Sequence, residues 1–401
     1  MTTSTPGPLN RRGPRPLLLH LTLAMLKSSA SIAASPNSSG ASMNWSEAVS
    51  ERAQAIADAI AGRESAFPEA VFAEAMRQDA QLIAGIAAYR RHPWKRELPD
   101  PPTLWQEGGT RLLDFGGHGR PVLFVPSLIN RSTVLDLAPG RSMMRALAAA
   151  GPRVLLLDWG WPEEAERRFT LTDYIAGRLE RALAAVGEPV VLAGYCMGGL
   201  LTAALAERRP ERVAALALLA TPWDFHAGDP GRAQSLARLL PLLEPAIALG
   251  NALPIDALQL LFAMLDPFGI ADKYRAFAKL DQASPRAELF VALEDWLNDG
   301  VPLAAPVARE CLTGWYGANT PARREWRIAG LPVDPSKLAV PAFVAIPWRD
   351  RIVPPESALP LASLIPGAVV HRPAAGHIGM AAGSTAETVL WRPFLEWVRG
   401  L

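Results

Sequence analysis

The sequence predicts an α/β fold in which a mostly parallel sheet carries helices on both faces and an inserted helical segment forms a cap. Short apolar runs alternate with helical segments on either side of a long interruption, a pattern typical of parallel sheets covered by helices. A glycine-flanked cysteine, Cys196, lies where one apolar run passes into a helical run. With 401 residues, the chain has room for one catalytic core and an insertion.

The first 44 residues predict a flexible leader rich in Ser, Pro and Gly. An apolar run over residues 17–26 follows two arginines, as in a short secretory signal, but His20 and Lys27 interrupt it. The run has about half of the roughly 20 residues that a bilayer requires. A surface-binding helix followed by a linker is therefore favoured over a cleaved signal peptide.

Residues 45–103 predict a helical region and a linker. Apolar residues recur there at helical spacing, at Val49, Ala53, Ile56, Ala57 and Ile60. The prolines between residues 93 and 102 predict an extended arm that leads into the core.

The catalytic core is predicted over residues 104–221 and 338–401. Its candidate strands are the short apolar runs at residues 111–115, 121–125, 153–158, 189–193, 213–219, 340–346 and 368–372. Its candidate helices lie between them, at residues 141–150, 171–186, 197–209, 356–364 and 385–399. Each connection from strand through helix to strand should cross over with a right hand.

The interruption over residues 222–337 predicts a helical cap inserted into the core. No strand-like series occurs there, and apolar helical stretches such as residues 239–243 and 258–262 take its place. This apolar character fits the packing of the cap onto the core, which we favour, and also the lining of an acyl-binding cleft.

Charge and cysteine content narrow the class of function. Lys and Arg number 40 against 39 Asp and Glu, so the formal net charge of +1 provides no global field for nucleic acid or an anionic membrane. The cysteines, Cys196 and Cys311, cannot form a disulfide framework. A reducing, cytoplasmic location fits this composition.

The residues Gly-Tyr-Cys-Met-Gly-Gly at 194–199 predict a nucleophile elbow, a tight turn between a strand and a helix. Glycines flank the nucleophile because a side chain there would press on the neighbouring strand or helix. A helix that begins at Met197 directs its N-terminal dipole at the Cys196 sulfur and favours the thiolate. A thiolate exchanges acyl groups readily with thioesters, which indicates acyl-thioester chemistry. The alternative for Cys196 is a small hydrophobe buried in a turn.

Two backbone N–H groups are candidates for an oxyanion hole. One belongs to Met197, the residue after the nucleophile. The other usually comes from the loop after an earlier strand, here residues 126–130, and we place it at Leu128.

The general base is expected among six histidines. Five of them are set aside because of their place in the chain. They precede the core, lie in a glycine-rich turn, lie at the start of the cap or fall inside a candidate strand, and they are His20, His92, His118, His226 and His371. His377 instead follows the last strand in a glycine-flanked loop, at the strand end where α/β enzymes place their chemistry. We therefore expect His377 to be the base.

The acid is expected after the strand at residues 340–346. Asp350 is the carboxylate that this loop offers before Glu356. It could instead be a turn residue or an ion-pair partner of Arg349 or Arg351. The order Cys196, Asp350, His377 is the nucleophile, acid, histidine order of α/β-hydrolases, so the sequence predicts that fold.

Several motifs resemble those of the polyhydroxyalkanoate synthases, which belong to the α/β-hydrolase superfamily. The elbow is similar to the lipase-like box of that family, and counterparts occur at residues 125–130, 135–137, 158–160, 296–300, 350–354 and 376–379. The likeness runs from about residue 104 to residue 401 and is closest to the shorter synthases that work with a separate subunit. One departure is Arg351, where the family commonly has histidine.

The resemblance implies a reaction. Cys196, deprotonated by His377, would attack the thioester carbonyl of a 3-hydroxyacyl-coenzyme A, release coenzyme A and pass the acyl group to a growing polyester. Coenzyme A thioester is then a substrate, and neither a cofactor nor a metal is expected.

The resemblance also implies partners and a location. A second synthase subunit and a second copy of this chain are the expected protein partners, and the surface of polymer granules in the cytoplasm is the expected place. Two other functions stay open. One is a cysteine-nucleophile hydrolase, either a thioesterase or a polyhydroxyalkanoate depolymerase, and the other is an inactive granule-associated binding protein.

Overall fold

The computed structural model describes residues 11–35 and 47–401, and the chain forms two compact units. The first unit comprises residues 1–94 and 262–298, and the second comprises residues 95–261 and 299–401. Residues 262–298 were predicted to belong to a continuous cap over residues 222–337. They pack instead with the N-terminal helices of the first unit.

The first unit is built from helices. Their bounds are α1 Leu17–Ala34, α2 Glu47–Ile60, α3 Phe67–Arg91, α10 Gly269–Phe277 and α11 Pro285–Asn298. Tyr89 of α3 is buried against Tyr274 of α10, with ring centroids 5.6 Å apart, and Phe277 and Phe290 stack beside them at 4.2 Å. Helix α1 lies within the predicted leader, so this part of the leader has regular structure.

Helix α1 is also long and apolar. Among the described helices it is the one whose 18 residues, with a mean hydropathy of 1.5, are long and apolar enough to cross a membrane. Signal sequences and the core helices of soluble proteins share this length and composition.

The second unit is built on an eight-stranded sheet with the order β1-β2-β6-β3-β7-β8-β13-β14. The pairs β1 with β2 and β2 with β6 are antiparallel, and all the others are parallel. The strands are β1 Thr103–Glu107, β2 Thr110–Asp114, β3 Pro121–Val125, β6 Arg153–Asp158, β7 Val190–Tyr195, β8 Val213–Leu219, β13 Ala342–Ala345 and β14 Val369–His371.

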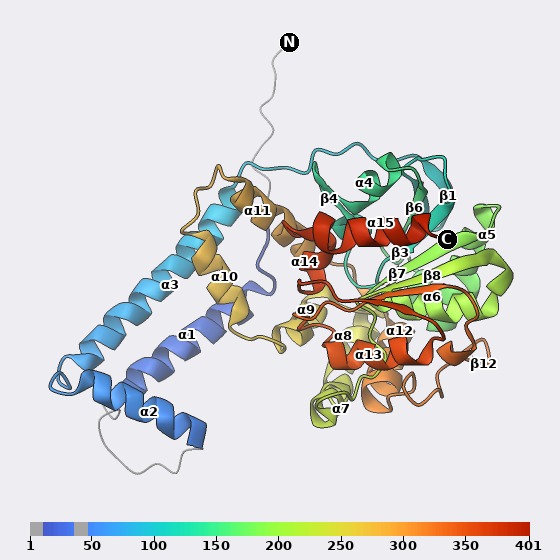
Figure 1. The fold of residues 1–401 in the computed structure, drawn as a ribbon. Helices are drawn as coiled ribbons and strands as arrows, with labels where there is room; N and C mark the ends of the chain where they lie inside the picture. Colours follow the sequence, from blue (N-terminus) through green and yellow to red (C-terminus); the bar gives the residue numbers. More distant parts are fainter. Residues whose placement is uncertain (1–10, 36–46) are drawn as a thin grey trace. The chain divides into compact units, whose positions relative to one another are not determined.

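Helices cover both faces of the sheet, with α4 and α15 on one side and α6 on the other (Figure 1). Successive residues of β3 explain this arrangement, because side chains of a strand alternate between faces. Leu123 and Val125 join the core cluster that includes α6, whereas Phe124 contacts Phe394 of α15 with ring centroids 5.6 Å apart.

The helices of the core are α4 Met143–Ala149, α5 Glu180–Ala185, α6 Met197–Arg208, α13 Pro355–Leu364, α14 His377–Ala382 and α15 Arg392–Arg399. Shorter 3-10 and π-helical segments are η2 Ser132–Leu135, η3 Glu166–Arg168, η4 Asp173–Leu179, η5 Pro210–Arg212, η7 Pro335–Lys337 and η8 Glu387–Trp391.

The rest of the interruption lies in the second unit and is mostly helical. Its helices are α7 Pro230–Ala237, α8 Leu240–Gly250, α9 Ile255–Ala263, α12 Ala305–Glu310 and the π-helix η6 Cys311–Gly317. Two short antiparallel pairs, β9 Ala252–Leu253 with β10 Leu303–Ala304 and β11 Arg327–Ile328 with β12 Leu331–Pro332, were not predicted. Strands of two residues are too short to show an alternating pattern. A third such pair joins β4 Asp136–Ala138 to β5 Arg141–Ser142.

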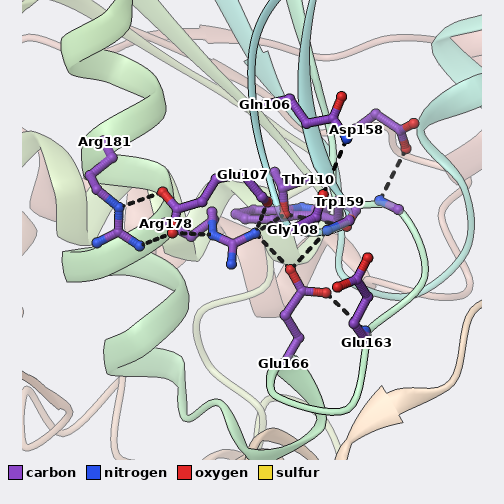
Figure 2. A network of polar contacts seen from close by, with 12 residues as sticks. Gln106, Glu107, Gly108, Thr110, Asp158, Trp159, Glu163, Glu166, Arg178 and Arg181 are labelled. Atoms are coloured by element: carbon purple, nitrogen blue, oxygen red, sulfur yellow. Dashed lines mark hydrogen bonds and ion pairs between the residues drawn. The ribbon is translucent and has the colours of Figure 1, made fainter.

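The β1–β2 hairpin at the edge of the sheet is held by a buried polar network (Figure 2). Arg178 of η4 donates to Glu166 at 2.6 Å and to the hydroxyl of Thr110 at 3.0 Å, and it also contacts the backbone of Glu107. The Arg178 and Glu166 side chains are only 5% and 4% exposed. Arg181, which is half exposed, binds the Glu107 carboxylate at 2.6 Å.

Candidate active site

Cys196 lies in the turn between β7 and α6, in a backbone conformation that costs energy. Its φ of 57° and ψ of −127° lie in a region that L residues rarely occupy. Its backbone N–H donates to the carbonyl of Leu219 at 2.8 Å and so ties the turn to the end of β8. The strained turn presents the thiol at the carboxyl end of the parallel strands, where α/β folds carry their sites.

The glycines of the elbow are required by close contacts. A Cβ at Gly194 would meet Thr202 and the backbone of Gly199, at the start of α6. A Cβ at Gly198 would press on the carbonyl oxygens of Val125 and Pro126, at the end of β3. These contacts bring the loop after β3 directly against the nucleophile turn.

Asp350 and His377 form a buried pair. The Nδ1 of His377 lies 2.6 Å from Oδ2 of Asp350, and the two side chains are 6% and 0% exposed. The other carboxylate oxygen, Oδ1, accepts the backbone N–H groups of Ile352 at 2.8 Å and Val353 at 2.9 Å. Because the carboxylate accepts, Nδ1 is assigned as the protonated nitrogen, which leaves Nε2 for the thiol.

Cys196 completes this group. Its side chain hydrogen-bonds to His377, so the structure brings together the nucleophile, acid and base named from the sequence. Burial lowers the pKa of His377, but the negative charges of Cys196 and Asp350 outweigh this effect and raise the pKa to about 10. The raised pKa favours the protonated imidazole of His377 at neutral pH.

The histidine lies at the start of a helix, and the prediction that it belongs to a loop is wrong in this respect. His377 is the first residue of α14 and follows Gly376. A hydrogen bond from the backbone N–H of Arg349 to the carbonyl of Ala375, at 3.2 Å, joins the acid loop to the segment before this helix. The acid and the base are therefore held by connected backbone.

The candidate oxyanion residues belong to two different elements. Met197 is the first residue of α6, so its N–H has no acceptor four residues earlier in the helix. Leu128 is buried in the loop after β3. That loop is fixed by Trp159, whose indole N–H donates to the carbonyl of Pro126 at 3.0 Å.

Two tyrosines near the thiol had no role in the sequence analysis. Tyr195 donates its hydroxyl to the carbonyl of His377 at 3.2 Å, and burial and the nearby charges of Cys196 and Asp350 raise its pKa well above the usual value. Tyr316 of η6 has a pKa raised by burial, then by Cys311 and Cys196. The position of Tyr195 next to the nucleophile was the available signal, whereas no motif marks Tyr316.

Two of the other histidines have hydrogen-bond partners outside the triad. His226 contacts the backbone carbonyl of Tyr316 at 2.8 Å, and His371 contacts that of Val389 at 2.6 Å. Across residues 11–35 and 47–401, no group of three or more His, Cys, Asp or Glu is arranged to hold a metal ion.

Comparisons with known proteins show which family this chain resembles. The α/β hydrolase fold family matches residues 120–383. The poly(3-hydroxyalkanoate) polymerase subunit PhaC of Haloferax mediterranei is 31% identical over 311 residues, which cover 73% of this chain and 62% of that protein. The protein of the same name from Synechocystis sp. is 30% identical over 294 residues, which cover 69% of this chain and 77% of that protein.

Among solved structures, the monoacylglycerol lipase of Paleococcus ferrophilus covers 72% of this chain and 98% of its own, with 16% identity and a TM-score of 0.46. The match to the archaeal PhaC spans less than two thirds of that relative, whereas the match to the cyanobacterial PhaC spans more than three quarters. The family match over residues 120–383 and the PhaC relatives lead to one assignment. The chain belongs to the poly(3-hydroxyalkanoate) polymerase PhaC family of α/β-hydrolase-fold proteins.

Proposed function

We propose that this protein polymerises 3-hydroxyacyl groups, taken from coenzyme A thioesters, into polyhydroxyalkanoate through a thioester on Cys196. The observation that carries the proposal is a cysteine at the elbow, hydrogen-bonded to a His377 that a buried Asp350 orients, in a chain of the PhaC family. A serine at the same position would make an ester, which is harder to exchange with thioester substrates.

The first half of the reaction loads the enzyme. The Cys196 sulfur attacks the thioester carbonyl, and a tetrahedral intermediate forms with its negative charge on the former carbonyl oxygen. The backbone N–H groups of Met197 and Leu128 are the proposed donors to this oxygen. The intermediate collapses as the carbon–sulfur bond to coenzyme A breaks, and the proton on His377 Nε2 passes to the departing thiolate.

The second half extends the polymer. A 3-hydroxyl group attacks an acyl thioester, its oxygen forms the new ester bond, and sulfur leaves as thiolate. The hydroxyl proton goes to a base at the site, either His377 directly or Asp350 acting with it. Exclusion of water favours this step over hydrolysis, and the apolar segments around η6 are the proposed barrier.

The test uses the purified full-length chain with 3-hydroxybutyryl-coenzyme A. We expect thiol release together with polymer, and free 3-hydroxybutyrate as the sole product would instead indicate a cysteine hydrolase. Cys196→Ala should abolish thiol release and leave the melting temperature nearly unchanged. Cys311→Ala is the matched control, because this second cysteine is buried in η6 and should leave turnover in place. Turnover that survives in Cys196→Ala would exclude the proposed nucleophile.

The partners belong to the same proposal. The relatives are named as polymerase subunits, which supports a second subunit. Action at the surface of cytoplasmic polymer granules is part of the same proposal. A homodimer is also proposed. An absence of thiol release with such a subunit present would favour an inactive binding protein.

A further inference from the structure

The loop that carries Asp350 also carries an exposed aromatic and cationic pair. The Trp348 side chain is 53% exposed, and the guanidinium carbon of Arg349 lies 4.5 Å from the centre of its ring. Trp348 therefore offers a large flat surface to solvent with a positive charge stacked on it, two residues before the acid. Neither side chain has a role in the chemistry proposed for the triad.

This pair has a fixed position relative to the site. The backbone N–H of Trp348 donates to the carbonyl of Pro373 at 3.3 Å, and that of Arg349 donates to Ala375 at 3.2 Å. The N–H of Asp350 closes a turn onto the carbonyl of Pro347 at 3.1 Å. Since Asp350 is itself bonded to His377, the loop holds the exposed pair and the buried pair as one unit.

The charged residues close to the pair in the sequence, or to its anchor Pro373, are mainly arginines. Arg349 and Arg351 flank Asp350, and Arg372 directly precedes the Pro373 that anchors Trp348. The carboxylates nearby in the sequence are Asp350, which is buried against His377, and Glu356 at the start of α13. An anionic ligand is therefore favoured over a cationic one on this surface.

An aromatic face beside a guanidinium is chemistry that recognises a nucleotide. A purine base stacks on an aromatic ring, and a guanidinium binds phosphate through parallel hydrogen bonds. A coenzyme A thioester carries a purine and phosphates at one end and the reacting carbonyl at the other, separated by a flexible arm. We propose that Trp348 and Arg349 form the subsite for the nucleotide end of the coenzyme A thioester, a proposal that rests on the function proposed above.

The first experiment compares two thioesters, 3-hydroxybutyryl-coenzyme A and 3-hydroxybutyryl-pantetheine, which lacks the nucleotide. The quantity compared is the kcat/KM for the coenzyme A thioester divided by the kcat/KM for the pantetheine thioester. In Trp348→Ala and in Arg349→Gln this ratio should fall about tenfold, mainly through a higher KM for the coenzyme A thioester. Trp348→Phe keeps an aromatic face and should recover much of the ratio. Arg392→Gln is the matched control for loss of an exposed arginine, because Arg392 lies on α15 and pairs with Glu387 at 2.8 Å.

An equal loss of kcat/KM for both thioesters would show that the pair only supports the loop, and an unchanged kcat/KM for both would show that it has no role. Either result overturns the subsite. The second experiment needs no turnover and titrates coenzyme A itself into the Cys196→Ala chain by calorimetry. Trp348→Ala and Arg349→Gln should each raise the Kd for coenzyme A about tenfold in that background.

These readouts separate the two proposals. Weakened binding of coenzyme A in a protein that releases no thiol would retain the subsite and overturn the polymerase. If the wild type forms polymer, and the Trp348 and Arg349 variants change neither the kcat/KM ratio nor the Kd for coenzyme A, the polymerase proposal is retained and the subsite is overturned. Failure of the Cys196→Ala chain to bind coenzyme A would also overturn it.

Discussion

Asp350 shows how one carboxylate can organise the whole site. One oxygen fixes the imidazole of His377, and the other accepts two backbone N–H groups of its own loop, at Ile352 and Val353. The side chain is fully buried, so its hydrogen bonds are made in surroundings of low dielectric and are correspondingly strong. Removal of its charge should therefore affect both the orientation and the protonation of the base.

Asp350→Asn should lower kcat for thiol release about a thousandfold or more, because the amide can hold the wrong tautomer of His377 and no longer stabilises its positive charge. Stopped-flow detection of the released thiol measures this loss. Glu356→Gln, six residues further on the exposed start of α13, is the control and should retain activity. Equal rates for Asp350→Asn and the wild type would exclude Asp350 as the acid.

At the scale of single residues, the sequence was enough to predict the three side chains that the structure brings together. Cys196, Asp350 and His377 each follow an apolar strand, and their order along the chain limits the choice. Tyr316 could not be found in this way, because its proximity to the thiol depends on how η6 packs, and no strand precedes it. Long-range packing of this kind leaves no local pattern in a sequence.

Among the elements, β3 and α6 pack closely at Gly198. Gly198→Ala should lower the free energy of unfolding by about 1–3 kcal/mol and also reduce turnover, because the new methyl group meets two backbone carbonyl oxygens that cannot move independently. Denaturant titration and thiol release measure the two effects. Gly177→Ala is the control, since a Cβ there meets only the flexible end of Arg181 at 3.5 Å. It should change stability by less than about 1 kcal/mol.

The edge hairpin provides a second prediction at this scale. Arg178→Met should lower the free energy of unfolding by about 3–5 kcal/mol, because Glu166 would remain buried without its partner. Arg181→Met removes an exposed arginine from the same network and should cost less than about 1 kcal/mol. Chemical denaturation followed by circular dichroism compares the two variants. Similarly small losses of unfolding free energy in both variants would show that the buried pair of Arg178 and Glu166 adds little stability.

Most elements of the sheet could be predicted because buried parallel strands are continuous apolar runs. The bounds of β3, β6 and β8 agree with the prediction residue for residue. Strand β1 was missed because it is an edge strand with mostly exposed side chains. Helix α14 was missed because its six residues are flanked by glycines, which indicate a loop.

For the whole molecule, the raised pKa of His377 predicts how stability depends on pH. The pKa rises from 6.5 to about 10 on folding, so the contribution of the protonated imidazole is complete below about pH 6.5 and is lost as the pH rises to about 10. The free energy of unfolding of the wild type, measured relative to His377→Gln, should therefore be largest near pH 6 and shrink toward pH 10. A difference that is constant over this range would contradict the raised pKa.

The division into two units was not predictable from composition. Residues 262–298 are mostly helical, like the rest of the interruption, and no local pattern assigns them to the first unit. Their place is decided by partners far away in the chain, such as Leu82 and Tyr89 of α3. A sequence pattern reports which face of a helix is apolar but not which distant helix covers it.

This arrangement limits how the protein can be shortened. A chain reduced to residues 95–401 would keep α10 and α11 but lose α3, and Tyr274 and Phe277, now among the most deeply buried side chains, would be open to water. Such a fragment would be prone to aggregate through these aromatic rings. The first unit is thus built from two separate stretches of the chain, residues 1–94 and 262–298. A soluble hydrolase-fold fragment requires the removal of both stretches together.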